Sequence, residues 1–458
     1  MVLTPRPRRS ALGLSLGGAA MLAAMVCLGP PAAMAGDAPP SAEDASAQTF
    51  AIHGQTTVID QVNLAFTSPY AGANSLPGKA EGRETVDVTL YAGLRPWRGA
   101  EIWVNPEIDQ GFGLHNTTGV AGFPSGEAYK VGQSDPYLRL QRLFLRQTID
   151  LGGAASAVDA DLNQLAGAQT ADRVIVTVGK FNVTDVFDTN KFAHDPRHDF
   201  LNWALIDAGT FDYAADAWGY TVGAATEWYE GSWVWRAGVF DLSDVPNSTR
   251  LDPGFGQFQL EGEIEKDYQL GGQAGAIKLT GFLSRGRMAS FADAIALGEA
   301  TGAPPNVALV RQYRGRGGLS FDLQQQLTPE LGLFARGGFA GGGVEPYEFA
   351  DIDRTISAGL SLSGKRWGRS GDTVALASVV NEISTIHQQY FAAGGLGILI
   401  GDGKLPHPGA EQIVETYYDA ALGKFLHLVL DYQFVVNPAY NRDRGPVSIF
   451  AARLHVQF

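Results

Sequence analysis

Apolar and polar side chains alternate along many short segments of this chain, most clearly at its end. In residues 448–458, one set of alternate side chains is apolar and the other is polar or small. The apolar set is Phe450, Ala452, Leu454, Val456 and Phe458, and the other is Ala451, Arg453, His455 and Gln457. Because successive strand side chains point to opposite faces, this pattern predicts a strand between an apolar and an aqueous medium.

The alternating segments come in pairs that are joined by short turns. Residues 85–94 are followed by a turn at 95–99 and by a second alternating segment that starts at Ala100. Residues 220–230 and 233–241 repeat this arrangement. Alternating strands of this kind also occur in soluble β-sandwiches. Whatever the fold, two alternating segments joined by a short turn predict a β-hairpin.

The apolar face of these hairpins is expected to meet lipid rather than a protein core. The face that carries Val222 and Trp228 is expected to include Tyr220, and Trp233 follows directly after the turn. Aromatic side chains near strand ends are typical of barrels whose aromatic girdles lie at the bilayer interfaces. On the opposite face of such segments, carboxylates such as Glu263 would be costly to bury in a dry core.

Long connections rich in glycine and proline separate the hairpins. They are expected at 110–136, 152–172, 243–256, 288–311, 341–353 and 384–410. Short turns at one end and long loops at the other are typical of outer-membrane barrels. At about 25 residues per strand with its connection, the chain provides about 16 strands, enough to enclose an aqueous lumen. We therefore predict an all-β fold, a transmembrane antiparallel β-barrel of about 16 strands with short periplasmic turns and long extracellular loops.

The first residues resemble an export signal. Arg6, Arg8 and Arg9 precede an apolar run, and Ala33-Met34-Ala35 provides a small-residue cleavage pattern. We expect a signal peptide at 1–35, a flexible leader at 36–49 and a single barrel domain at 50–458, with an uncleaved anchor as the alternative for the first segment. After residue 35 no run of eighteen apolar residues predicts a transmembrane helix.

Composition excludes several classes of function. The single cysteine, Cys27, lies in the predicted signal peptide, so no thiol or disulfide chemistry is expected in the exported chain. The formal net charge is −14 and no basic stripe is present, which argues against a nucleic-acid partner. The H-E-x-x-H, G-x-S-x-G and phosphate-loop patterns are absent, so we predict neither an enzyme nor a cofactor.

Residues 137–147 contain a break in the alternation. Leu138 and Leu140 are in one phase and Leu143 is in the other, which predicts a β-bulge near Gln141 and Arg142. The bulge would point Arg139, Arg142 and Arg146 into the lumen, opposite the inward carboxylates Glu101 and Glu107. Charged walls across a constriction and ordinary ion pairing within the barrel wall remain equal interpretations of this arrangement.

Residues 179–203 end a strand and continue into a polar loop. Asp185, Asp188 and Asn190 have oxygens that could bind calcium, but the EF-hand spacing and its closing glutamate are absent. His194 and His198 have no evident third ligand for a transition metal. We predict no metal site, and calcium binding to the loop at 182–199 stays open as an alternative to internal hydrogen bonding.

This loop and five other segments resemble the carbohydrate-selective outer-membrane porins of the OprB type. The other segments are Asp212-Tyr213-x-x-Asp216-x-x-Gly219-Tyr220, Arg95-Pro96-Trp97-Arg98-Gly99, Asn105-Pro106-Glu107-x-Asp109-x-Gly111, Gly122-Phe123-Pro124-x-Gly126 and Asp431-Tyr432-Gln433-x-x-x-Asn437-Pro438. The resemblance spans residues 50–458. It implies a 16-stranded barrel that admits sugars such as glucose by passive diffusion, through a pore narrowed by arginines, carboxylates and aromatic side chains.

A neutral sugar needs paired hydrogen-bond donors and acceptors together with a flat apolar surface. Inward-facing residues that meet these needs form our candidate substrate-binding set: Trp103, Asn105, Glu107, Arg139, Arg142 and Arg146. Trp103 could instead simply fill space in the wall. A general or ion-selective porin is the first alternative function, and an outer-membrane barrel hydrolase assembled from separate strands is the second.

The expected location is the cell outer membrane, and the expected partners are its lipid and a mono- or oligosaccharide. The aromatic last strand, which ends at Phe458, resembles the signal that the barrel-assembly machinery recognises. Monomer and trimer both remain open.

Overall fold

The computed structural model describes residues 47–458 except 129, 253 and 350. The predicted signal peptide at 1–35 and most of the predicted leader at 36–49 lie outside the described residues. The described chain contains sixteen strands in one antiparallel sheet. They are β1 (Phe50–Asn63), β2 (Glu81–Leu94), β3 (Ala100–Gly111), β4 (Gln133–Val158), β5 (Gly167–Phe181), β6 (Thr221–Glu230), β7 (Trp233–Asp241), β8 (Phe258–Leu270), β9 (Gln273–Met288), β10 (Gln312–Gln326), β11 (Leu331–Ala340), β12 (Arg354–Ser363), β13 (Thr373–Glu382), β14 (Glu411–Ala421), β15 (Leu426–Val436) and β16 (Val447–Gln457).

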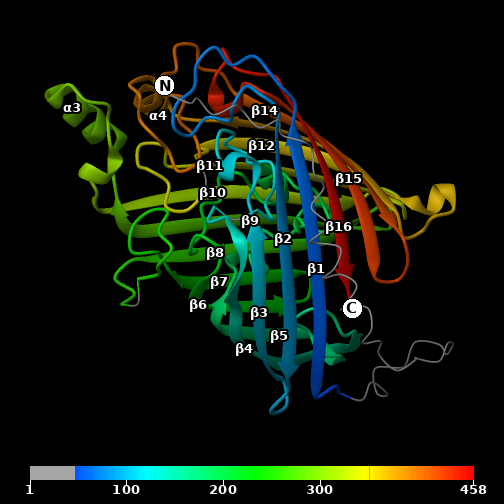
Figure 1. The fold of residues 1–458 in the computed structure, drawn as a ribbon. Coiled ribbons are helices and arrows are strands. Elements are labelled where there is room, and N and C mark those ends of the chain that lie inside the picture. The colour runs from blue at the N-terminus through cyan, green and yellow to red at the C-terminus, as the bar shows by residue number, and fades with distance from the viewer. Residues whose placement is uncertain (1–46, 129, 253, 350) are drawn as a thin grey trace, which may run out of the picture.

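The sheet closes on itself into a barrel (Figure 1). Each strand pairs with its neighbours in sequence, and β1 pairs with β16 from Gln55 opposite Gln457 to Asn63 opposite Ile449. Closure leaves no sheet edge exposed around the barrel wall, as a strand structure within a bilayer requires. The predicted antiparallel barrel of about 16 strands is confirmed.

Helices are short and lie in the connections. They are α2 (Trp203–Ile206), α3 (Phe291–Thr301) and α4 (Thr385–Ala392), with 3-10 turns η1 (Leu114–Asn116), η2 (Val183–Asp185), η3 (Val307–Leu309), η4 (Gly364–Trp367) and η5 (Pro438–Tyr440). Across the described part of the chain, no helix combines the length and apolar character needed to span a bilayer.

The predicted alternation separates the two faces of the barrel wall. In β15, Leu430 is 59% exposed on the outer face, whereas Asp431 and Gln433 are buried on the inner face. In β16, Phe450 is exposed outward and Arg453 is buried inward. Polar side chains therefore line the interior, and an apolar surface faces outward.

The aromatic hairpin β6–β7 contains one error of prediction. Trp228 and Trp233 are exposed on the outer face as expected, and the rings of Trp228 and Trp235 lie 5.0 Å apart. Tyr220, however, precedes β6 and its side chain is buried, so its predicted place on the lipid-facing side is wrong. The alternation was extended one residue beyond the start of the strand, into a loop that enters the lumen.

The connections differ strongly between the two ends of the barrel. Short turns at one end occupy 95–99, 159–166, 231–232, 271–272, 327–330, 364–372 and 422–425. Long loops at the other end occupy 64–80, 112–132, 182–220, 242–257, 289–311, 341–353, 383–410 and 437–446. This asymmetry was predicted from the sequence, and both described ends of the chain lie on the short-turn side.

The predicted long loop at 152–172 is wrong. Most of these residues belong to the paired ends of β4 and β5, and their turn at 159–166 lies on the short-turn side. Gly152 and Gly153 have φ values of 132° and 82°, and the register shifts between Asp150 and Ala155. Glycines at bulges and a run of small residues produce a loop-like sequence, although the backbones pair as a ladder.

Substitution of an outer-face residue by arginine tests whether that face contacts lipid. Leu430 lies near the middle of β15, and Leu430→Arg is expected to destabilise the barrel by about 2–4 kcal/mol because a cation at the bilayer midplane is poorly solvated. Urea titration of the barrel folded in liposomes would measure the change. Leu430→Val is the control, because it keeps the position apolar. Equal stability of the two variants would contradict a lipid-facing Leu430.

Candidate pore constriction

The loop at 182–220, between β5 and β6, enters the barrel and crosses to the opposite wall. The backbone N–H of Asn202 donates to Glu415 of β14 at 3.0 Å. Arg336 of β11 donates to the carbonyl of Leu205 at 2.7 Å, and Arg453 of β16 donates to the carbonyl of Asp199 at 3.0 Å. Buried wall charges thus satisfy the backbone groups that a loop brings into the interior.

The loop at 112–132 packs beside it. The N–H groups of Ala121 and Gly122 donate to Glu411 at 3.0 and 2.8 Å. The Phe123 ring stacks on Trp203 of α2, with centroids 4.9 Å apart. Two loops therefore form a single packed body inside the barrel.

Arg197 connects this body to β2 and β3. Its guanidinium lies 3.0 Å from Asp87, 3.1 Å from Glu107 and 2.7 Å from Glu127, and it donates to the hydroxyl of Tyr91 at 3.1 Å. All of these side chains are buried. One cation therefore compensates a cluster of carboxylates that would otherwise repel one another.

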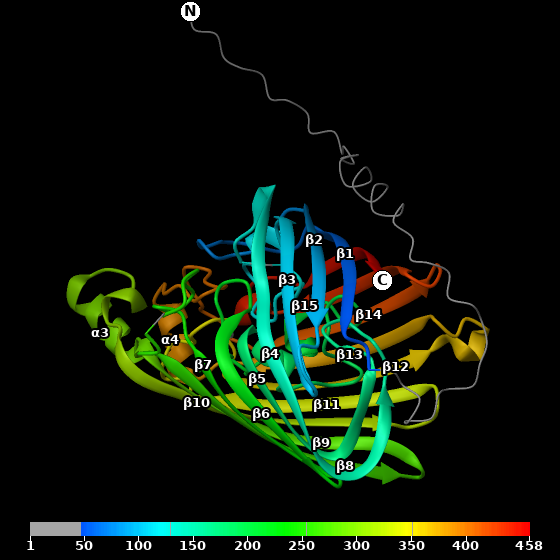
Figure 2. The same cartoon turned by 90° about the horizontal axis from the view of Figure 1, so that it is seen from below.

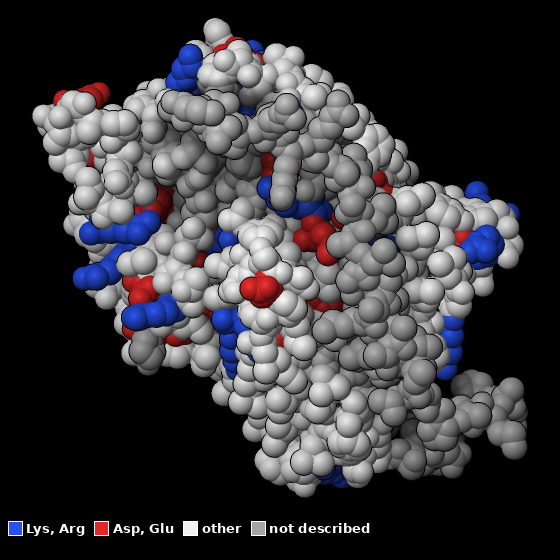
Figure 3. Space-filling model, viewed as in Figure 1, with Lys and Arg blue, Asp and Glu red and all other residues white. Residues whose placement is uncertain are grey.

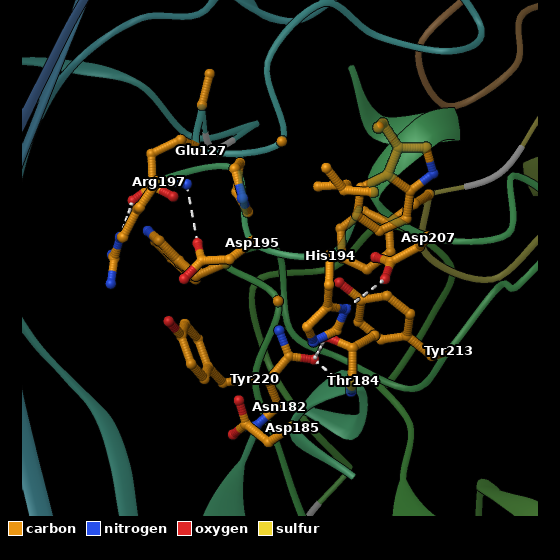
Figure 4. A pocket seen from close by; sticks show the side chains of 18 of the residues that line it. Glu127, Asn182, Thr184, Asp185, His194, Asp195, Arg197, Asp207, Tyr213 and Tyr220 are labelled. Carbon is orange, nitrogen blue, oxygen red and sulfur yellow. Dashed lines mark hydrogen bonds and ion pairs between the residues drawn. The ribbon is translucent and has the colours of Figure 1, made fainter. Parts of the chain in front are cut away.

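A cavity of about 240 Å³ lies between the 182–220 loop and the wall at β4 (Figure 4). Arg142 of β4 forms a two-pronged ion pair with Asp185 of η2, at 2.6 and 2.8 Å. The same guanidinium lies 5.0 Å from the centre of the Tyr220 ring. Donors, acceptors and aromatic surface thus meet in one cavity.

Two titratable groups on the loop border this cavity. Burial opposes the charged form of His194, but its contact with Asp207 raises the pKa of His194 above its usual value. Burial alone would raise the pKa of Asp195, but His198 and Arg197 lower it to about 2. The cavity therefore combines groups of both signs.

A second cavity of about 760 Å³ lies closer to the short turns. Arg95, Glu101, Arg146 and Arg236 are among its lining residues, and Asp185 borders both cavities.

Figure 3 shows acidic and basic side chains in small clusters of both signs on the face of the molecule in Figure 1, rather than one field of a single sign.

The three predicted arginines all point inward, and Gln141 is the extra residue of the predicted bulge. Arg142 lines the first cavity and Arg146 lines the second, where it donates to the carbonyl of Asn163 at 2.8 Å. Arg139 stacks on the Trp218 ring at 3.3 Å and pairs with Asp216 at 3.1 Å. The bulge thus distributes the arginines over different environments.

The three predicted residues of β3 are buried in the wall. Trp103 packs flat on Gly93, where an added Cβ would lie 2.4 Å from the indole. Asn105 lies opposite Arg142 in the β3–β4 register, and Glu107 pairs with Arg197. Among the described residues that line the two cavities, none of these three occurs.

Arg197 and the role of Asp185 were not predicted from the sequence. Asp185 entered only as a possible calcium ligand, and it is instead paired with Arg142. Arg197 lies in the polar loop predicted within residues 179–203, but nothing local indicates partners that are 70 and 90 positions away. Within the described residues, no group of three or more His, Cys, Asp or Glu side chains is arranged to hold a metal ion.

Solved structures provide one useful comparison. The high-pH structure of Pseudomonas putida OprB covers 90% of this chain and 94% of its own length, at 16% identity and a TM-score of 0.66. The outer-membrane channel DcaP of Acinetobacter baumannii covers 89% of this chain and 97% of its own length, at 10% identity and a TM-score of 0.49. The first likeness shows a shared fold.

No curated protein matches this chain. The model of the carbohydrate-selective porin OprB family matches residues 74–458, which is most of the chain. The protein is therefore a member of the OprB family of carbohydrate-selective porins, and it is a sugar-selective channel of the outer membrane.

Proposed function

We propose that a neutral sugar is recognised in the cavity between Arg142, Asp185 and Tyr220, and then passes Arg146 towards the periplasm. The observation that carries this proposal is the meeting of a guanidinium, a carboxylate and an aromatic ring at one point of the lumen. Arg142 would donate to sugar hydroxyls and Asp185 would accept from them. The Tyr220 ring would cover an apolar face of the sugar.

The balance of charge favours a neutral substrate of the glucose type over an ion. Arg142 and Asp185 neutralise each other, and the wall of the second cavity carries both Arg146 and Glu101. An anion or a cation would meet a like charge at each step, whereas a sugar can exchange hydrogen bonds with both. Binding must remain weak enough for release, and diffusion of this kind requires no catalytic step.

The other predicted site residues would support the constriction from behind. Glu107 would act through Arg197, which holds the inserted loop. Arg139 would hold the loop next to β6 through Asp216 and Trp218. Trp103 and Asn105 would keep β3 closely packed behind Arg142.

Assembly is a separate part of the proposal. Phe458 follows β16 and its ring lies over Gly54 of β1, with 42% of the residue exposed on the outer face. Its N–H and carbonyl both bond to Gly54 at 3.0 Å. A terminal aromatic residue at the closing seam would suit recognition by the barrel-assembly machinery.

Conductance in planar bilayers tests the proposed function. We expect a small ion current that millimolar glucose or a short oligosaccharide reduces, because the sugar occupies the constriction that ions use. Free passage of simple ions with no effect of any sugar would favour the general or ion-selective alternative. Lipid or peptide hydrolysis that is lost with one serine or histidine substitution would favour the hydrolase alternative.

A further inference from the structure

The hairpin of β4 and β5 extends well beyond its neighbours. Pairing of β3 with β4 ends at Gln147, and pairing of β6 with β5 ends at Arg173. Between them, residues 148–172 form a two-stranded hairpin with no third strand among the described residues. An isolated hairpin is only marginally stable in water, so other contacts must hold this one in place.

The turn of the hairpin, residues 159–166, is attached to the barrel wall by two arginines. Arg95 donates to the carbonyls of Gln48 at 2.7 Å, Ala166 at 3.0 Å and Leu165 at 3.4 Å. Arg146 donates to the carbonyl of Asn163 at 2.8 Å. The bonds to Asn163, Leu165 and Ala166 fix the backbone of the turn.

The hairpin bends to bring this turn into the lumen. The bulges around Gly152 and Gly153 change the direction of the two strands, and Figure 2 shows the teal hairpin curving back towards the barrel. Leu165 is only 1% exposed. The second half of the turn, residues 162–166, is therefore packed against the barrel interior, whereas residues 159–161 are exposed.

The turn also borders both cavities. Leu162 and Asn163 line the first cavity, whereas Gln164 and Leu165 line the second. A solute that moves from one cavity to the other therefore passes the turn. Asp185 of the inserted 182–220 loop also borders both cavities.

We propose that the β4–β5 turn is a second restriction, on the periplasmic side of the sugar-binding constriction, and that it sets the largest saccharide that leaves the channel. This inference rests on the proposed path of the sugar through both cavities. The first constriction selects by hydrogen bonding, and the turn selects by size, because its backbone is fixed by Arg95 and Arg146.

A shortened hairpin tests this directly. Residues 155–170 would be replaced by Asn-Gly, which favours a tight hairpin turn and leaves the ladder from Leu143 opposite Lys180 to Asp150 opposite Arg173. We expect larger ion conductance and, in liposome swelling with graded maltooligosaccharides, a size limit raised by at least one sugar unit. An unchanged size limit in the folded variant would overturn the proposal.

Two arginines of one turn provide a matched pair of point variants. Arg95→Ala removes the bonds to the 159–166 turn, whereas Arg98→Ala removes the same charge from a side chain that is 92% exposed and pairs with Asp150, outside the turn, at 3.4 Å. We expect a raised size limit and a noisier current for Arg95→Ala only, and equal behaviour of the two variants would count against the restriction. Block by glucose is the separate readout of the proposed function. If glucose does not block the unsubstituted protein, the proposed function is rejected, but the comparison of saccharide size limits between the variants still stands.

Discussion

Arg197→Met is expected to raise the single-channel conductance severalfold and to weaken block by glucose at least tenfold. Arg197 is the cation that Asp87, Glu107 and Glu127 share inside the barrel. Removing one partner of a buried ion pair costs about 3–5 kcal/mol, because the remaining charge stays desolvated. Movement of the inserted loop away from β2 and β3 would let water reach the carboxylates and relieve this penalty, and such movement opens the constriction.

Arg250→Met is the matched control for this substitution. Arg250 lies in the loop at 242–257, where its side chain is 78% exposed and pairs with Asp244 at 3.1 Å. An exposed pair of this kind contributes about 0–1 kcal/mol, so conductance should stay unchanged. Planar-bilayer recordings of both variants would measure their conductance and glucose block. Heat-dependent gel mobility would check that both variants are folded. Unaltered conductance and glucose block in folded Arg197→Met would show that the loop is held without this cluster.

The barrel could be predicted because its signal is local. Alternation along a strand depends only on which medium each face meets, so residues such as Leu430 and Asp431 could be assigned to their faces without knowledge of their neighbours. The bulge at Gln141 was predicted for the same reason, since a change of phase is visible within a few residues.

The interior could be predicted only in part, because its contacts are long-range. Arg142 faces a cavity as expected, but its partner Asp185 comes from the inserted loop, 43 positions away. The sequence of that loop indicates polarity and not the wall on which it lies, which is why Arg197 was missed. The misplaced loop at 152–172 has a different cause: a ladder of small residues and glycines carries no alternation to detect.

The second large effect concerns the sugar site itself. Arg142→Ala is expected to lower the affinity for glucose by about tenfold to a hundredfold, because hydrogen bonds to charged groups contribute about 1.5–3 kcal/mol. Folding should be little affected, since Arg142 lies at the cavity and the ladder around it is made by backbone groups. Arg146→Ala should widen the second cavity and weaken glucose block to a smaller extent, because Arg146 is bonded to Asn163.

Substitution of Asp185, the ion-pair partner of Arg142, provides the control for Arg142→Ala. Arg142→Ala leaves the Asp185 carboxylate in the first cavity without its partner cation, whereas Asp185→Asn leaves Arg142 without its partner carboxylate and keeps an oxygen that can accept from the N–H of Asn182. Reversal potentials in a salt gradient should therefore shift towards cation selectivity in the first variant and towards anion selectivity in the second. Both variants should lose glucose block, because a sugar needs the donor and the acceptor together. Shifts of the same sign, or glucose block unaltered in both, would place the sugar site elsewhere in the lumen.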